Sequence, residues 1–231
     1  MIRPLSFTSL DNAIEILFEA LIASLRKQGV IINKGSIIDA TIVKAPIQRN
    51  KRSENDDIKN GNIPTAWSNK KKSHKDIDAN WTAKHGKQYF GYKNHVKMDK
   101  KTKIITKTFT TEASTSDSKG FAPLLEDDDI GKTMHMDSGY VYDAVKAVLL
   151  AGGVKPRIQS RGVRNKPLDE AQMKRNHKLS SIRCRVEHAF GSMSTCFGPA
   201  IIRTIGIERA RVKNVMRTLT YNIKRVSYLM G

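Results

Sequence analysis

Three acidic side chains stand where this sequence could perform chemistry. Asp39 lies within the run Gly35-Ser-Ile-Ile-Asp-Ala-Thr-Ile-Val, which is typical of a short buried strand. Asp137 ends a second short apolar stretch that begins at Met134, just before a glycine turn. Glu187 falls in a segment whose apolar residues recur at helical spacing. A carboxylate within an apolar strand is costly to bury, so it needs a cation or several hydrogen-bond donors as partners.

Each acid also has a plain structural interpretation. Asp39 could cap a neighbouring loop at the end of its strand. Glu187 lies four residues after Arg183 on one helical face, which alone predicts an ordinary ion pair worth roughly 0.2–0.5 kcal/mol. Together, however, the two strand acids and the helix acid could converge at one end of a mixed sheet, where they would repel one another without divalent cations. Oxygen-only ligands suit Mg²⁺ or Mn²⁺.

The elements that must position these acids follow from the spacing of apolar residues. Helices are expected over 8–28, in the segment that carries Phe121 and Leu124, directly after Asp137, over 178–196 and over 208–229. Strands are expected around Asp39 and over 88–99, 104–111 and 155–159. Apolar residues of the last helix, Met216 and Ile223 among them, are expected to face the core. Asp39 would thus precede a hairpin, and Asp137 would end a later strand of the same sheet.

Two polar segments interrupt this pattern. Residues 44–88 form a polar, basic insertion after the first strand, which either clamps nucleic acid or is a solvated excursion. Within it, Trp67 and Trp81 could stack on bases or anchor the insertion to the core. The four consecutive acids at 126–129 point in successive different directions, so we expect a solvated loop there rather than a metal site.

The composition points to a polyanionic partner. The chain has 231 residues, 41 Lys and Arg against 22 Asp and Glu, a formal charge of +19 and a pI near 10.0. This excess favours a nucleic-acid phosphate backbone, with an anionic membrane surface as the main rival. No apolar run approaches the roughly 18 residues that a spanning helix needs, and no membrane partner is expected. Cys184 and Cys196 form no Cys-x-x-Cys pair, which suits a reducing compartment.

Several short motifs occur in a characteristic order over roughly residues 30–229. They are Gly35-Ser-Ile-Ile-Asp39-Ala-Thr, Lys87-Gln-Tyr-Phe-Gly-Tyr-Lys-Asn-His95, Asp137-Ser-Gly-Tyr140, Arg183-Cys-Arg-Val-Glu187-His-Ala-Phe190 and Tyr221-Asn222-Ile-Lys-Arg225. Each is weak alone, but all of them in order are specific. The sequence resembles a bacterial insertion-sequence transposase of the DDE superfamily, of the insertion-sequence-five type within the insertion-sequence-four group.

This resemblance implies a fold and an activity. The fold is α/β, a ribonuclease-H-like mixed sheet flanked by helices, with Asp39, Asp137 and Glu187 as the catalytic, metal-binding triad. The activity is Mg²⁺-dependent (or Mn²⁺-dependent) cleavage of DNA at transposon ends, followed by attack of the freed 3′ hydroxyl on target DNA. Arg183 matches the family's arginine before the glutamate, and we expect it to hold a phosphate or to orient Glu187.

Other positions are weaker matches or depart from the family. Lys93 and His95, on what we expect to be the exposed side of their strand, are further DNA-contact candidates. His135 shares its side of the strand with Asp137, but we expect a structural role for it. Related enzymes often carry a tyrosine and a lysine where this chain has Ser180 and Ser194, which weakens the expected contacts to terminal phosphates.

The order of the motifs also predicts a domain division. We expect an N-terminal helical remnant over 1–34 and a catalytic domain over 35–231, including the insertion at 44–88. Relatives usually have a DNA-recognition region ahead of the first acid, so a truncated or frameshifted copy, or one part of a split product, is expected. The alternatives are a DNA-binding relic without catalysis and a host metal-dependent nuclease of the same fold. The family further implies a cytoplasmic, nucleoid-associated bacterial location and a homodimer that pairs two transposon ends.

Overall fold

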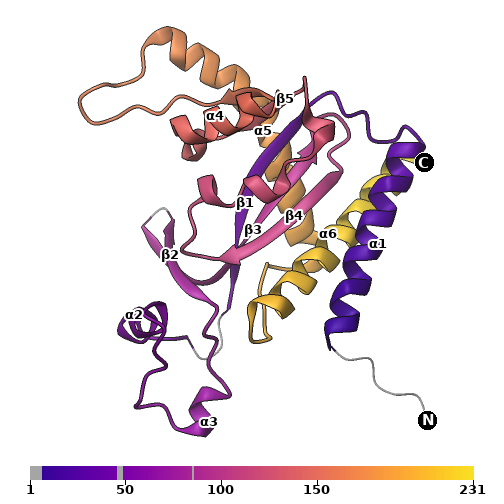
Figure 1. The fold of residues 1–231 in the computed structure, drawn as a ribbon. Helices are drawn as coiled ribbons and strands as arrows, with labels where there is room; N and C mark the ends of the chain where they lie inside the picture. Colours follow the sequence, from indigo (N-terminus) through magenta and orange to yellow (C-terminus); the bar gives the residue numbers. More distant parts are fainter. Residues whose placement is uncertain (1–6, 46–48, 85) are drawn as a thin grey trace, which may run out of the picture.

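A six-stranded mixed sheet forms the centre of the protein (Figure 1). The computed structural model describes residues 7–45, 49–84 and 86–231. Residues 1–6 of the expected N-terminal region, and residues 46–48 and 85 of the expected insertion, lie outside the described residues. The strands are β1 (Ser36–Lys44), β2 (Asn80–Lys84), β3 (Lys87–Asp99), β4 (Ile105–Glu112), β5 (Thr133–Met136) and β6 (Lys155–Ile158).

The strands change direction across the sheet. Their order is β2-β3-β1-β5-β6, and β4 also pairs with β3. β1 runs antiparallel to β3, which is antiparallel to β2 and β4, whereas β5 and β6 continue from β1 in parallel. This arrangement confirms the expected α/β class, a ribonuclease-H-like mixed sheet flanked by helices. It also puts β1, which carries Asp39, at the centre, next to the strand that precedes Asp137.

Helices cover both faces of this sheet. α5 (Glu170–Phe197) and α6 (Ile207–Met230) pack on one face, where Ile37 meets Val186 and Tyr221. α4 (Asp143–Ala151) and a series of short 3₁₀ turns pack on the other face, where Ile38 meets Leu149. Successive side chains of a strand point to opposite faces, so the Ile-Ile pair before Asp39 serves both cores. Burial on both faces explains why β1 is almost continuously apolar.

The first and last helices lie side by side (Figure 1). α1 (Phe7–Lys27) buries Phe18, Ile22 and Leu25 against Val215 of α6, as its helical spacing predicts. The described part of the 1–34 segment therefore shares a core with the C-terminal helix. The division at residue 34 stays a prediction.

The buried side of α6 differs from the one expected. Met216 and Ile223 are exposed, whereas the polar side chains of Asn214 and Asn222 are buried. The reason is that α6 packs against β4, an edge strand with unpaired backbone groups. The Asn222 amide accepts from the N–H of Ile105 at 2.9 Å and donates to its carbonyl at 2.8 Å. Closing the edge of the sheet thus takes precedence over apolar burial at this position.

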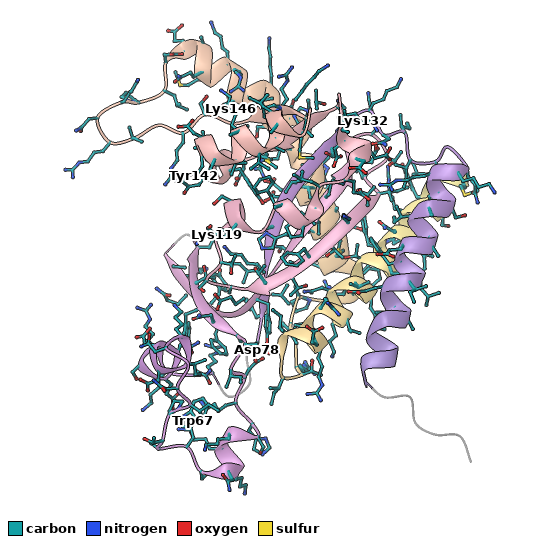
Figure 2. The ribbon with its side chains drawn as sticks, in the orientation of Figure 1. Trp67, Asp78, Lys119, Lys132, Tyr142 and Lys146 are labelled. Atoms are coloured by element: carbon teal, nitrogen blue, oxygen red, sulfur yellow. The ribbon has the colours of Figure 1, made fainter. Side chains whose placement is uncertain are left out.

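The basic insertion carries defined elements in its described part: α2 (Arg52–Lys59), α3 (Asn69–Lys72) and β2. Trp67 is buried, and its indole N–H donates to Oε1 of Glu54 at 2.7 Å (Figure 2). The indole of Trp81 donates to the carbonyl of Asn50 at 2.8 Å and lies against Phe90, with ring centroids 5.3 Å apart. Of the two roles considered for these tryptophans, the structure therefore places both as anchors of the insertion.

The acidic segment after β4 is only in part the solvated loop that its run of charges suggests. Lys97, whose ammonium is almost fully buried on β3, binds Glu126 at 2.5 Å and Asp129 at 2.8 Å. Arg26 of α1 also binds Glu126 at 2.9 Å. Glu126 and Asp129 are therefore drawn into the protein by two cations, whereas Asp127 and Asp128 are exposed, as expected for a solvated loop. The expected helix around Phe121 is likewise replaced by 3₁₀ turns. These turns are η1 (Asp117–Lys119), η2 (Ala122–Leu124), η3 (Asp127–Asp129) and, after β5, η4 (Ser138–Tyr140).

The helix that carries Glu187 is longer than expected. α5 begins at Glu170 rather than near residue 178 because Asp169 caps it. The Asp169 carboxylate accepts from the backbone N–H of Gln172 at 2.7 Å, and the Gln172 side chain accepts from the N–H of Asp169 at 3.2 Å. Within the described ranges, no helix combines the length and apolar character needed to cross a membrane.

Candidate active site

Asp39 and Asp137 lie opposite each other on neighbouring parallel strands. Ile37 of β1 pairs with His135 of β5, and the backbone of Asp137 continues extended beyond β5. Two further residues along each chain bring Asp39 and Asp137 to the same level of the sheet. Because residues that pair in register share a face, both carboxylates belong to the side covered by α5. Sheet pairing thus brings together the first two acids predicted from the sequence.

The turn after β5 holds the second acid in place. Asp137 caps the 3₁₀ turn η4, and its Oδ1 accepts from the backbone N–H of Gly139 at 2.8 Å. A Cβ atom at position 139 would lie 2.9 Å from the same oxygen, so glycine permits this close approach. The other oxygen of Asp137 is left without a hydrogen bond within the described residues. The glycine turn seen in the sequence therefore orients the carboxylate.

Arg183 joins the helix acid to the central strand. Its Nη1 donates to Oδ2 of Asp39 at 2.8 Å, and its Nη2 donates to Oε1 of Glu187 at 2.5 Å. The predicted Arg183–Glu187 ion pair is thus present, but it is one half of a bridge that reaches Asp39. The Glu187 side chain is 53% exposed, whereas that of Asp39 is 11% exposed. The bridge spans from solvent to the interior of the site.

The environment of Asp39 disfavours its charge. Burial raises its pKa from 3.8 to about 6, although the Arg183 guanidinium and the backbone N–H of Ala40 act in the opposite direction. The negative charge of Asp137 raises it further, which shows that the two carboxylates interact. A second positive charge at this point would relieve both burial and repulsion.

Comparison with known proteins identifies the family. Residues 33–223 match the family described as "Transposase DDE domain", a range that includes Asp39, Asp137 and Glu187. The chain belongs to this family. The expectation of a DDE-superfamily transposase is therefore confirmed, while assignment to the insertion-sequence-five type stays a prediction.

One curated relative and one solved structure are similar to this chain. This transposase domain is 28% identical over 219 residues to "Transposase for insertion sequence element IS1106" of Neisseria meningitidis serogroup B, covering 94% of this chain and 74% of that protein. Among solved structures, the piggyBac transposase synaptic complex with hairpin DNA aligns with a TM-score of 0.45 and 9% identity. That alignment covers 86% of this chain and 48% of the other, so the chain spans about half the length of that transposase.

The donor atoms of the transposase site suit a hard divalent cation. Asp39 and Asp137 present oxygen ligands from adjacent strands, and their mutual repulsion favours a bound cation. Glu187 is connected to this pair through the Arg183 guanidinium, which contacts both Asp39 and Glu187. Within the part of the chain that the structure describes, no group of three His, Cys, Asp or Glu side chains is close enough to hold a metal ion. Of the three acids, the two aspartates are therefore the ones whose arrangement suits a divalent cation.

Tyr140 is a residue of the site to which sequence reasoning assigned no role. It is fully buried, and its hydroxyl lacks a hydrogen-bond partner among the described residues. Burial, together with the charges of Asp117, Asp39 and Asp137, raises the pKa of this hydroxyl well above its usual value. The signal that was available is its place three residues after Asp137, at the end of the same short turn.

Lys93 and His95 do not lie on an exposed side of their strand, so this expectation is wrong. His95 is fully buried, its Nε2 is 2.9 Å from Oγ1 of Thr111, and burial lowers its pKa to about 4. The Lys93 ammonium lies 2.9 Å from Asp117 and donates to the carbonyl of Thr115 at 2.7 Å. The 3₁₀ turns cover this face, which strand alternation cannot reveal. His95 is therefore not accessible at the surface, while the DNA-contact role of Lys93 stays a prediction.

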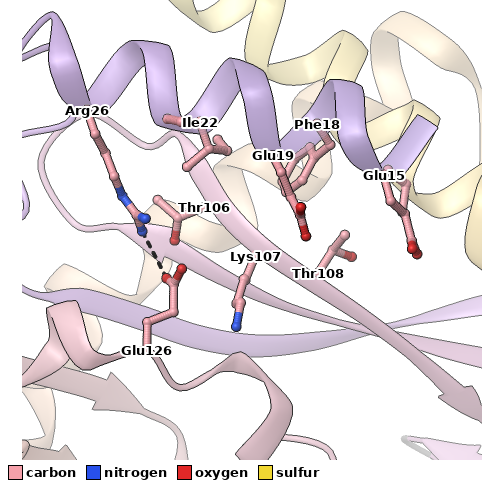
Figure 3. Close-up of a pocket in the computed structure, with 11 residues that line it drawn as sticks. Glu15, Phe18, Glu19, Ile22, Arg26, Thr106, Lys107, Thr108 and Glu126 are labelled. Carbon is pink, nitrogen blue, oxygen red and sulfur yellow. Dashed lines mark hydrogen bonds and ion pairs between the residues drawn. The ribbon is translucent and has the colours of Figure 1, made fainter. Parts of the chain in front are cut away.

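A pocket elsewhere on the protein is separate from these acids. It lies between α1 and β4, has a volume of about 280 Å³, and combines apolar Phe18 and Ile22 with acidic Glu15 and Glu19 (Figure 3). The Arg26–Glu126 ion pair closes one end (Figure 3). None of the three candidate acids lines it. This pocket is therefore distinct from the candidate active site.

Proposed function

We propose that this transposase domain performs metal-dependent cleavage of DNA at the ends of an insertion sequence and joins the freed 3′ end to target DNA. The proposal rests on one observation. Asp39 and Asp137 lie opposite each other on adjacent strands, and Arg183 joins Asp39 to Glu187. Membership of the Transposase DDE domain family and the charge of +19 support DNA as the substrate.

Each residue has a defined part in this proposal. Asp39 and Asp137 would hold Mg²⁺ or Mn²⁺, with Glu187 joining them after it turns away from Arg183. A bound cation would supply Lewis acidity toward the phosphate and the attacking oxygen. A cation beside Asp39 would take over the charge compensation now given by Arg183. The guanidinium, whose buried Nε has no partner among the described residues, could then hold a phosphate oxygen.

The test is cleavage of a labelled duplex that carries the end of the element. With Mg²⁺ the parent should cut at the end, and Asp137→Asn should lower the cleavage rate by more than about 100-fold. Mutating even a residue that only hydrogen-bonds to a metal ligand lowers metal affinity or activity by roughly 10- to 100-fold. Asp127→Asn is the matched control, because it removes the same charge from an exposed turn and should leave the rate unchanged. Equal rates for the parent and Asp137→Asn would contradict the proposed metal site.

Other outcomes separate the alternatives. Binding without cleavage by the parent would favour a DNA-binding relic, and cleavage that ignores the end sequence would favour a general nuclease. Asp39→Ala should abolish cleavage but keep DNA binding equal or slightly stronger, because it removes a negative charge near the phosphates. Binding should also weaken steeply as salt rises. Light scattering with and without end DNA would test the proposed homodimer.

A further inference from the structure

Three cationic side chains are linked to β5 around the position of a buried histidine beside the candidate active site. Arg157 of β6 pairs in register with His135 of β5, which in turn pairs with Ile37 of β1. In-register residues share a face, so Arg157 and His135 belong to the same face as Asp39 and Asp137. His135 lies two residues before Asp137, about 7 Å along the strand.

Lys100 and Arg185 complete this group. The Lys100 ammonium donates to Oγ1 of Thr133, at the start of β5, at 2.9 Å. Arg185, on α5, donates to the backbone carbonyl of Lys100. Arg157 is the cross-strand neighbour of His135, and Thr133, which the Lys100 ammonium contacts, lies two residues before His135 on the same face of β5. Burial, together with the charges of Lys100, Arg157 and Arg185, lowers the pKa of His135 to about 4. We call Lys100, Arg157 and Arg185 the cationic cluster.

No acid neutralises the cationic cluster. Among the described residues, none of its three members has a carboxylate within ion-pair distance. Asp99, the acid whose charge acts on Lys100, is already used by the backbone N–H groups of Lys101, Thr102 and Asn33. Burial and the neighbouring charges, those of Arg157 and Arg185 among them, lower the pKa of Lys100. Among the described residues, the fold therefore holds three like charges together with no ion pair to any of them.

A buried polar atom points to the missing partner. His135 is only 4% exposed, and its Nδ1 has no hydrogen-bond partner in the described part of the chain. In one neutral tautomer this nitrogen is a donor. Solvated surface cations would explain Arg157, which is exposed, but not the half-buried Lys100 and Arg185 beside an unpaired imidazole. Guanidinium and ammonium groups gathered around a further donor are the pattern that binds a phosphate.

We infer that the cationic cluster is a subsite for one DNA backbone phosphate, adjacent to the phosphate that is cut at Asp39 and Asp137. The inference rests on the proposed function, because it takes the same DNA strand as its ligand. It gives β6 a part in holding the substrate, in addition to the strands that carry the acids. Holding the neighbouring phosphate would fix the scissile bond against the two aspartates.

The test couples one protein charge to one DNA charge. Duplexes carrying the element's end are made with a single neutral methylphosphonate linkage, placed in turn at each position within about two nucleotides of the cut. Affinities are measured in EDTA for the parent, for Arg157→Gln and for Lys146→Gln. Lys146 is the control, an exposed lysine on α4 at the other face of the sheet (Figure 2).

Arg157→Gln should weaken binding of unmodified DNA about tenfold and lower the slope of log affinity against log salt by about 0.9. At one position, the neutral linkage should lower the DNA affinity of the parent by a similar factor but leave the DNA affinity of Arg157→Gln almost unchanged. This coupling is the signature of a direct contact. Lys146→Gln should respond to that linkage as the parent does. Because Arg157 is exposed on an edge strand, its variant should fold normally, and Lys100→Gln provides a second test of the same coupling.

The outcomes distinguish this inference from the proposed function. If the parent cuts end DNA with Mg²⁺ but every linkage weakens the parent and Arg157→Gln equally, the subsite is wrong and the proposed function stands. If the parent neither binds nor cuts end DNA, both fail. If inorganic phosphate at matched ionic strength raises the Tm of the parent but not of Arg157→Gln, without coupling to any linkage, the cluster binds free phosphate and the DNA subsite is overturned.

Discussion

The guanidinium Nη1 of Arg183 lies 2.8 Å from Oδ2 of Asp39, although 144 positions separate the two residues in the chain. This contact fastens α5 to the central strand at the candidate active site. It also means that the charge of Asp39 is compensated by the protein itself, so a bound cation and Arg183 compete to compensate the same acid. Two predictions on stability follow from this competition.

Arg183→Gln should destabilise the metal-free protein. Without the guanidinium, Asp39 keeps the backbone N–H of Ala40 as its one donor among the described residues, and we expect the free energy of unfolding to fall by about 1–3 kcal/mol. Saturating Mg²⁺ should restore part of the loss, because binding to the folded state alone adds stability. Urea denaturation in EDTA and in Mg²⁺ measures both values.

Lys174→Gln is the control, because it breaks an exposed ion pair with Glu170 on the same helix. It should change the free energy of unfolding by less than about 0.5 kcal/mol. A loss as large as that of Arg183→Gln would contradict the prediction.

The amount by which the buried Asp39 carboxylate lowers the free energy of unfolding should depend on pH. Its pKa is raised from 3.8 to about 6, so between these values the folded protein binds a proton that the unfolded chain releases. The charged carboxylate therefore lowers stability above pH 6, and this cost disappears as the pH falls toward 4. In EDTA, Asp39→Asn should be more stable than the parent at pH 7, by up to about 3 kcal/mol, and the difference should narrow at lower pH.

Urea denaturation of both proteins at several pH values measures this difference. His95 and His135, whose lowered pKa values make acid destabilising, are present in both proteins and cancel in the subtraction. A gap that widens below pH 6 would mean that the ion pair with Arg183 outweighs the burial of Asp39.

Tyr140→Phe should leave the metal-free protein as stable as the parent or up to about 1 kcal/mol more stable. The hydroxyl is buried without a partner among the described residues. Removing it therefore breaks no hydrogen bond and relieves a desolvation cost. Tyr140→Ala should instead cost about 3–5 kcal/mol, since it empties a fully buried ring site. Thermal and urea unfolding of both variants provide the measurement. A loss above about 1 kcal/mol in the phenylalanine variant would show that the hydroxyl is hydrogen-bonded after all.

Lys97→Met should cost about 3–5 kcal/mol, because it leaves the buried carboxylate of Asp129 without its cation. Lys107 on β4 is the matched control, since it is the direct cross-strand partner of Lys97 and donates only to the carbonyls of Pro123 and Leu125. Lys107→Met should cost less than about 1 kcal/mol. Similar losses in the two variants, measured by urea denaturation, would mean that the acidic segment contributes little to stability.

The spacing of apolar residues in the sequence was sufficient to predict the elements that carry the acids. The isoleucines around Asp39 alternate between two cores, and the turn of Asp137 and Gly139 is set by residues two positions apart. Such patterns depend on local geometry, which side-chain type and spacing encode directly. Strand alternation failed at His95, because both faces of the sheet are covered and a polar side chain there is buried like an apolar one.

The order of residue types along the chain is enough to show that two strand acids and one helix acid follow one another within a basic α/β chain. The packed fold was needed to show that Arg183 bridges Asp39 and Glu187, that Asn222 closes the edge strand, and that buried Lys97 pairs with Glu126 and Asp129. It also brought Lys100, Arg157 and Arg185 together around His135. The physical reason is that each of these contacts joins segments far apart in the chain, and the choice of a charged group's partner depends on which groups the packed sheet leaves within a few ångströms.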